Sequence, residues 1–512
     1  MNWKKSRQNR DSHLWSFLFL ITIISVYALI WYLHPRTLVA SDQSGYSEIA
    51  YKIMTGHFGQ DPSDHIFYHR IGLTVPVALF YKWFGINTTS AHLWTLLGGI
   101  MSILAVWLAV PSRLGKMLGI IILAFSPVFY LNSAELLPDT VVSGLMMLSA
   151  VLLYYRRRAA VNWFPGLLFP LLGIFFLFWA FLTKATAYWT LIFWIAVFIH
   201  DLRLKRFTLI KRFYLPAFGF FLLLGSGYLI FCNSIWGSPW ARLESMQALT
   251  GQHLWTINGN WDAVKDRLWG GIRHFWFHNF YYVPFLGLAG AIFCFRKIRF
   301  WAFYALLSLF IWWFGSTSFI VYDPLPFMPR MFLPVLTLLA VTGGFLVGNW
   351  LDKIDRRQIM YYFKIVVTLI LLIILLRPAF YPRNLAAFRY PDIEKLAMER
   401  FKKAITEVPK PVLILTADAR SCSYLKFFFG YELPEDIGLD FYGNLSEEKH
   451  GRFNTFFYFI NHGRSNFLHQ AYGLDVYDSV MEANSRQPYI FSFDDVVLSR
   501  APAPDWLSGN GF

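Results

Sequence analysis

Apolar runs of about twenty residues recur along most of this sequence. That length is what an α-helix needs to cross a bilayer hydrocarbon core, which is roughly 30 Å thick. Apolar residues make up 56% of the 512 residues and charged residues only 15%, well below the roughly 25% of soluble chains. A large soluble core would break into shorter segments. The sequence therefore predicts an all-α integral membrane protein with many transmembrane helices.

Eleven segments are predicted to span the membrane: 14–33, 91–110, 117–131, 140–155, 164–182, 186–200, 213–232, 280–295, 300–315, 331–350 and 362–380. The first follows several basic residues and lacks a small-residue cleavage site, so it is interpreted as a retained signal anchor. With the N-terminus in the cytoplasm, every strongly basic loop falls inside, as the positive-inside rule requires. The formal charge of +15 is spread over these loops, and a nucleic-acid partner is therefore not expected.

The outer side then receives residues 34–90, 132–139, 233–279, 316–330 and everything after about 381. The apolar stretch 71–84 is short and contains Pro76 and Lys82, and counting it as a span would reverse the charge pattern. Residues 46–84 are therefore expected to form amphipathic segments on the outer membrane surface.

The chain is predicted to have two domains, a transmembrane domain of residues 1–380 and a small extracytoplasmic α/β domain of residues 381–512. The second prediction rests on lower hydrophobicity, a helical pattern at 393–405 and strand-like runs at 412–415 and 456–460.

Three acids on the predicted outer side are candidates for chemistry. Asp42 follows the first apolar run, and a partly desolvated carboxylate there can act as a general base toward an acceptor hydroxyl. Its position alone favours a helix N-cap instead. Glu135 and Asp139 lie in the turn before the fourth span, where they can hold an acceptor or a cation. Capping of the following helix is the more common role for Asp139.

Three cations lie where positive charge is sparse: Arg70, Lys184 at the end of the fifth span, and Arg330 at the start of the tenth. A lipid phosphate sits at this depth, and its oxygens pair well with Arg and Lys. Snorkelling to ordinary headgroups explains such positions equally well. The histidines are scattered and do not support a metal site, so no cofactor is expected, while a divalent metal stays open as an unsupported alternative.

In their order along the chain, these residues resemble the GT-C superfamily of membrane glycosyltransferases. The similarity is to the branch of protein O-mannosyltransferases and bacterial lipid A aminoarabinose transferase, within glycosyltransferase family 39. It covers roughly residues 14–350. The matching positions are Asp42 with Tyr46, Ala50 and Gly56, Arg70 with Pro76, Phe84 and Gly85, Glu135 with Asp139, Thr183 with Lys184, and Arg330 with Leu333 and Pro334.

The resemblance implies a GT-C fold and a polyprenyl-phosphate sugar as donor. It makes Asp42 the catalytic base and places Arg70, Lys184 and Arg330 near the donor phosphate. Tyr46, Glu135 and Asp139 are then further site residues. Gln43 follows Asp42, so the paired acids of some relatives are missing, which leaves a metal-dependent mechanism unsupported.

The predicted activity is transfer of a hexosyl or pentosyl group to an envelope lipid, glycan or protein, with inversion at the anomeric carbon. The resemblance places it on the extracytoplasmic side of a bacterial inner or plasma membrane. A transporter or flippase is the main alternative, but such proteins usually carry ionisable groups at mid-membrane depth within inverted repeats. A non-catalytic assembly protein whose tail binds a partner is a third alternative.

Overall fold

The computed structural model describes residues 2–33, 42–59, 66–156, 163–248, 265–270, 283–316, 328–352, 410–416, 419–441, 455–461, 489–493 and 496–500, with residues 401, 403, 405 and 453. These form two compact units. The first contains residues 1–33, 59–73 and 93–385, and the second contains residues 34–58, 74–92 and 386–512.

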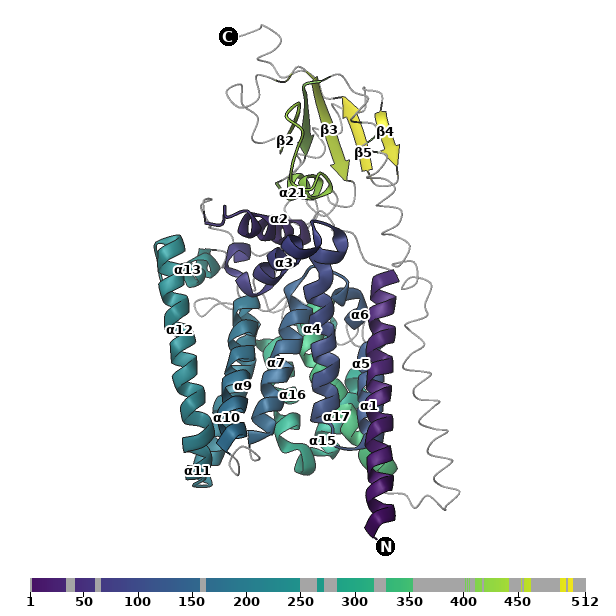
Figure 1. Ribbon diagram of the computed structural model, residues 1–512, viewed down its shortest axis with the longest axis vertical. Coiled ribbons are helices and arrows are strands. Elements are labelled where there is room, and N and C mark those ends of the chain that lie inside the picture. Colours follow the sequence, from purple (N-terminus) through teal and green to yellow (C-terminus); the bar gives the residue numbers. More distant parts are fainter. Residues whose placement is uncertain are drawn as a thin grey trace. The chain divides into compact units, whose positions relative to one another are not determined.

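The first unit is a bundle of long apolar helices (Figure 1). They are α1 (Asn2–Leu33), α4 (Thr88–Ala109), α5 (Arg113–Ala124), α6 (Pro127–Ser133), α7 (Pro138–Tyr154), α9 (Trp163–Thr183), α10 (Tyr188–Arg203), α11 (Phe207–Leu209), α12 (Leu215–Trp236), α13 (Ala241–Ala248), α15 (Val283–Phe293), α16 (Phe295–Phe314) and α17 (Leu333–Asp352). Short 3-10 or π turns occur at Ile66–His69, Ala185–Ala187, Ile210–Tyr214, Asp266–Gly270 and Pro329–Phe332.

The predicted polytopic helical fold is confirmed. Within the described residues, seven helices are long and apolar enough to cross a membrane, or eight with the bent pair α5 and α6. The apolar helices α7 and α15 are shorter. Helices occupy ten of the predicted spans. The eleventh, 362–380, lies outside the described residues, so the total of eleven stays a prediction.

The prediction of one continuous span over 117–131 is wrong. The axes of α5 and α6 differ by 63°. Between them Ser126 adopts an extended conformation, with φ −67° and ψ 122°, and Pro127 opens α6. A proline disfavours the helical conformation of the residue before it and removes a backbone donor, so the helix stops here and restarts in a new direction.

Small residues let the central helix α17 approach its neighbours closely. A Cβ atom added to Gly290 on α15 would lie 2.1 Å from the carbonyl oxygen of Thr342 on α17. The Thr342 hydroxyl donates a hydrogen bond of 2.7 Å to the carbonyl of Gly287. On the α5 side, a Cβ at Gly115 would meet the carbonyl of Gly344 at 2.5 Å. Such close backbone contacts are typical of helix packing in membranes.

The second unit contains α2 (Asp42–Met54), most of α3 (Ile71–Phe84), α21 (Ala419–Phe428) and a five-stranded sheet. The strands are β1 (Val412–Thr416), β2 (Ile437–Phe441), β3 (Thr455–Asn461), β4 (Tyr489–Phe493) and β5 (Val496–Arg500), in the order β2-β1-β3-β5-β4. β1 pairs in parallel with β2 and β3, whereas β5 is antiparallel to β3 and β4.

The predicted strands at 412–415 and 456–460 correspond to β1 and β3. β1 is buried along its whole length. Phe401 and Ile405, from the predicted helical pattern, belong to the core cluster that packs around β1. The helices expected within 46–84 are present as α2 and α3.

Candidate functional site

A buried ion pair joins the N-terminal end of α7 to the C-terminal end of α9. Lys184 Nζ lies 2.5 Å from Asp139 Oδ1, and the two side chains are only 11% and 5% exposed. Both residues were candidates from the sequence, but their pairing was not predicted. It brings together an acid and a cation that are 45 residues apart in the chain.

The local sequence explains the position of Asp139. Pro138 begins α7, preceded by the extended residue Leu137 at the N-cap. Asp139 is therefore in the first turn and does not cap the helix, so the capping role expected for it is wrong. A carboxylate in this turn interacts favourably with the positive end of the helix dipole.

Lys184 is extended, with φ −158° and ψ 142°, between the end of α9 and the following 3-10 turn. The chain that carries Arg70 is anchored beside it. The indole nitrogens of Trp94 and Trp179 both donate to the carbonyl of Gly72, each at 3.0 Å. A Cβ at Gly72 would lie 2.5 Å from the Thr183 hydroxyl, so only glycine permits this approach.

Arg70 and Arg330 complete a cluster around the ion pair. Both arginines interact electrostatically with the Asp139 carboxylate and with the Lys184 ammonium. Arg70 also lies over the ring of Phe67, with its guanidinium carbon 5.3 Å from the ring centre. Three cations thus lie within electrostatic range of the Asp139 carboxylate, and positive charge gathered at a largely buried place favours an anionic ligand. We call Arg70, Asp139, Lys184 and Arg330 the cationic cluster.

Arg242 on α13 is a buried cation that the sequence interpretation missed. It is only 5% exposed, and its guanidinium carbon lies 4.4 Å from the ring centre of Phe181, one turn before Lys184 on α9. Among the described residues, neither Nε nor Nη1 has a hydrogen-bond partner. Burial lowers the pKa of Arg242, because a desolvated charge is costly. The criterion used for Arg330, a cation on the sparsely charged side that is predicted to be outer, would also have found it.

Glu135 lies in the short turn between α6 and α7 and is half-buried. Its carbonyl accepts a hydrogen bond of 2.8 Å from the amide of Leu137, which shapes the turn before Asp139. No group of three or more His, Cys, Asp or Glu residues in the described part of the chain is arranged to hold a metal ion.

Asp42 and Tyr46 belong to the second unit. Asp42 is the first residue of α2 and is partly exposed, whereas Tyr46 is fully buried one turn later. In this first turn a carboxylate interacts favourably with the positive end of the helix dipole, and the N-cap role expected for Asp42 stays a prediction. The proposed role of Asp42 as a base stays a prediction.

Contacts with α21 and its C-terminal loop fix the orientation of α2. The Tyr431 hydroxyl donates to the Ser47 hydroxyl at 2.7 Å, and Tyr431 stacks on Tyr51 with ring centres 4.6 Å apart. Glu48 accepts hydrogen bonds from Ser423 and, at 3.4 Å, from Lys426. The helix that begins with Asp42 is thus attached to the C-terminal α/β part of its unit.

The sequence matches no protein-family model and no curated protein at a significant level. Solved structures do match. ArnT from Cupriavidus metallidurans in the apo state has 13% identity and a TM-score of 0.57, over 94% of this chain and 97% of that one. ArnT bound to undecaprenyl phosphate has a TM-score of 0.52 over 94% and 98%. The oligosaccharyltransferase of Archaeoglobus fulgidus has 13% identity and a TM-score of 0.51, over 83% of this chain and 64% of that chain.

These neighbours are membrane glycosyltransferases of the GT-C superfamily. The chain has the GT-C fold. The resemblance expected from Asp42, Arg70, Lys184 and Arg330 is therefore confirmed as a likeness of fold. ArnT matches over nearly its whole length, so the GT-C likeness extends beyond the residues 14–350 identified in the sequence.

Proposed function

We propose that this protein is a glycosyltransferase that takes a sugar from a polyprenyl-phosphate carrier and transfers it to an acceptor on the extracytoplasmic side of the membrane. The observation that carries the proposal is the cationic cluster, in which Arg70, Lys184 and Arg330 surround a single described acid. The fold shared with ArnT, one structure of which contains undecaprenyl phosphate, supports a lipid phosphate as the anion.

The charge of the cationic cluster suits the leaving group. A sugar phosphodiester carries one negative charge, and the polyprenyl phosphate that departs gains more as its second ionisation, with a pKa near 6, becomes available. Three of the four residues that define the cluster are cations. Such a site stabilises the departing phosphate more than the bound donor, which is what accelerates the reaction.

Asp139 has the role of orienting Lys184. The ammonium has three N–H donors, and one of them points to Asp139 Oδ1 at 2.5 Å. The carboxylate therefore fixes the ammonium while the remaining donors serve phosphate oxygens. Arg242, whose Nε and Nη1 atoms are buried, is a further candidate for binding a polar group of the donor.

In the proposed reaction, the Asp42 carboxylate takes the proton of an acceptor hydroxyl as its oxygen attacks the anomeric carbon. The bond from that carbon to the phosphate oxygen breaks, and the electron pair leaves with the polyprenyl phosphate. Attack opposite the leaving group inverts the anomeric configuration. A phosphate is already a good leaving group, so the residues named here suffice for the proton transfer and for charge stabilisation.

The positions of the buried ion pairs support transfer over transport. In the described part of the chain, Lys184 pairs with Asp139 at the start of α7, and Arg156, just after the end of α7, pairs with Asp201. Both pairs lie at the ends of spanning helices. The mid-membrane ionisable groups that characterise transporters are not part of this arrangement.

The proposal is tested by incubating the purified protein with undecaprenyl-phosphate-linked hexoses and pentoses and following release of undecaprenyl phosphate. Binding of undecaprenyl phosphate and of undecaprenol, which lacks the charge, is compared in parallel. We expect release with at least one donor and binding at least tenfold tighter for the phosphate. Equal binding of the two lipids would contradict the proposed donor class.

A further inference from the structure

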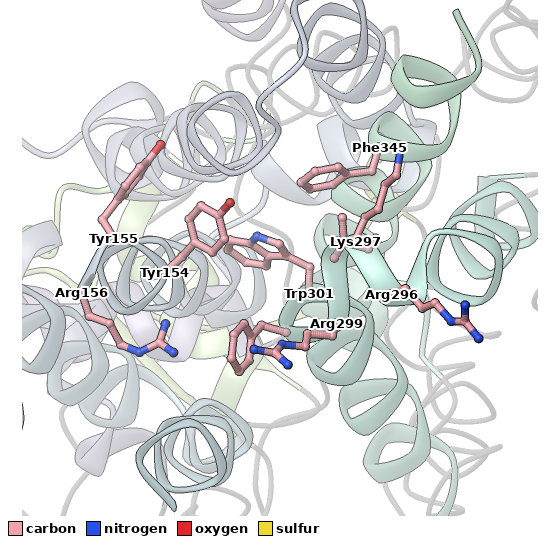
Figure 2. A pocket seen from close by; sticks show the side chains of 10 residues that line it. Tyr154, Tyr155, Arg156, Arg296, Lys297, Arg299, Trp301 and Phe345 are labelled. Atoms are coloured by element: carbon pink, nitrogen blue, oxygen red, sulfur yellow. The ribbon is translucent and has the colours of Figure 1, made fainter. Parts of the chain in front are cut away.

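A second basic site lies at the far end of α7 from the cationic cluster. Asp139 and Tyr154 are fifteen residues apart on α7, which corresponds to about 22 Å along a helix rising 1.5 Å per residue. A pocket of about 440 Å³ opens there (Figure 2). It is lined by Tyr154, Tyr155, Arg156, Arg296, Lys297, Ile298, Arg299, Phe300, Trp301 and Phe345. The distance separates it from the proposed donor site.

Among the described residues that line this pocket, four are cations and none is a carboxylate. Arg156 is neutralised from behind by Asp201, at 2.5 and 3.1 Å. Asp201 is also shared with Arg206, at 2.8 Å. Lys297 donates to the neutral Asn349 side chain, at 2.5 Å. Among the residues that the structure describes, Arg296 and Arg299 form no ion pair. The pocket therefore has a positive charge that its own lining does not balance.

Aromatic contacts hold two of the guanidinium groups in place. The guanidinium carbons of Arg156 and Arg299 lie 4.9 and 5.0 Å from the ring centre of Phe300. Such cation–π contacts are stabilising and orient the planar groups. Figure 2 shows Arg156 and Arg299 reaching toward the same part of the pocket, while Arg296 points away. The arrangement presents preoriented donors to one bound anion.

The backbone adds to this preference for an anion. Ile298 departs from helical geometry, with φ −121° and ψ 30°, so a regular helical run starts at Arg299. The N-terminal end of a helix carries partial positive charge and attracts phosphate groups.

Exposed apolar side chains next to the cations indicate an amphiphilic ligand. Ile292, Phe293 and Phe295 are 61%, 80% and 45% exposed, and they directly precede Arg296 in the chain. In a membrane these side chains contact acyl chains at the depth where the basic side chains meet headgroups. Basic pockets between transmembrane helices recognise acidic lipid headgroups in this way.

We propose that this pocket binds the phosphate of an anionic membrane phospholipid, with Arg299 as its main ligand, Arg156 beside it and Lys297 as a further cation of the lining. The chemistry shared with any soluble ligand is the phosphate group. A lipid is favoured because the cations and the exposed apolar residues are contiguous. The inference does not depend on the proposed donor site, which lies at the other end of α7.

The test measures thermal unfolding of the full-length protein in detergent with added phosphatidylglycerol, phosphatidylcholine or inorganic phosphate. For the wild type we expect phosphatidylglycerol to act at concentrations at least tenfold below phosphatidylcholine. Lys297→Gln with Arg299→Gln should weaken the apparent affinity for phosphatidylglycerol at least fivefold. The matched control, Arg203→Gln with Lys211→Gln, removes two exposed charges from α10 and the π turn after α11, outside the described pocket lining, and should stay within twofold.

Equal effects of the two lipids, or equal affinity in the wild type and the pocket variant, would overturn the proposal. A stabilisation produced in full by inorganic phosphate at the same concentration would assign the pocket to a soluble anion and overturn it as a lipid site. If the pocket variant does not fold, native mass spectrometry of the wild type in equal amounts of both lipids decides. Preferential retention of phosphatidylglycerol supports the site, and equal retention overturns it.

Discussion

The ammonium of Lys184 and the carboxylate of Asp139 lie 2.5 Å apart in a buried environment, although 45 residues separate them in the chain. Removing one partner of an isolated buried pair typically costs about 3–5 kcal/mol. The two partners nevertheless differ in what surrounds them. Arg70 and Arg330 remain beside Asp139 when Lys184 is removed, whereas removal of Asp139 leaves three described cations together.

This asymmetry predicts that substitution of Lys184 mainly affects lipid binding, whereas substitution of Asp139 mainly affects stability. Lys184→Met should lower the melting temperature little, because two arginines still compensate Asp139, but it should weaken undecaprenyl phosphate binding by about 1.5–3 kcal/mol, the value of a charged hydrogen bond. Asp139→Asn should lower the melting temperature clearly. Thermal unfolding and lipid titration of both variants provide the test. A larger loss of stability in Lys184→Met than in Asp139→Asn would contradict the prediction.

We predict that Arg242 lowers the stability of the lipid-free protein and contributes to the binding of undecaprenyl phosphate. Its buried Nε and Nη1 atoms lack partners among the described residues, so the lipid-free protein bears a desolvation cost. Arg242→Met keeps the contact with the Phe181 ring and removes the charge. We expect a higher melting temperature without lipid and at least tenfold weaker binding of undecaprenyl phosphate. Unchanged lipid affinity in a stabilised variant would assign Arg242 a structural role only.

Glu48 predicts a defined pH dependence of the contact between α2 and α21. Burial alone raises the pKa of Glu48, but Lys426, the Ser423 hydroxyl and Lys52 outweigh it and hold the pKa below its usual value. A lowered folded-state pKa means that the contribution is complete above the ordinary pKa of about 4.3 and disappears as the pH falls through the folded-state value. Wild type should therefore exceed Glu48→Gln in stability by a constant amount above about pH 5, with the difference shrinking below about pH 4.

The control for this prediction is Glu244→Gln. Glu244 is an exposed acid on α13 that accepts a hydrogen bond from Ser238. Its effect on the melting temperature should be small at every pH, because exposed pairs contribute little. A wild-type advantage over Glu48→Gln that grows as the pH falls would show that the sign assigned to the Glu48 pKa is wrong.

The topology is tested with reporter fusions. The basic loops predict that the N-terminus lies in the cytoplasm, and that the proposed site and the residues after 381 lie outside. A fusion near residue 400 should therefore report an extracytoplasmic position, and one near Lys205 a cytoplasmic position. A cytoplasmic signal near residue 400 would contradict the eleven-span arrangement and the side assigned to the proposed site.

The sequence was sufficient for features that follow from local composition. The length of the apolar runs was enough to locate the helices. The predicted depth of Arg70, Lys184 and Arg330 in the membrane was enough to choose each of them as a candidate. The sequence could not show that Lys184 pairs with Asp139, since this depends on how α7 packs against α9. The break before α6 was visible in principle, because Pro127 is a local signal that apolar periodicity outweighed. Arg242 met the same criterion as Arg330 and was overlooked, whereas its burial follows from tertiary packing and could not be predicted.

Asp42 is the proposed base. A capping role and a catalytic role for this residue predict clearly different results for one substitution, Asp42→Asn. Asp42 begins α2, and Asn supports a helix start about as well as Asp. Asp42→Asn should therefore leave folding unchanged while losing roughly 10²-fold or more in turnover, since general base catalysis needs the carboxylate.

Asp42→Glu, which keeps the charge on a longer side chain, should recover part of the activity. Sugar transfer by the purified variants is measured together with their melting temperatures. None of the substitutions changes Glu48 or Lys426, whose contact attaches α2 to α21. Near-wild-type transfer by a well-folded Asp42→Asn would exclude Asp42 as the base and direct the same test to Glu135.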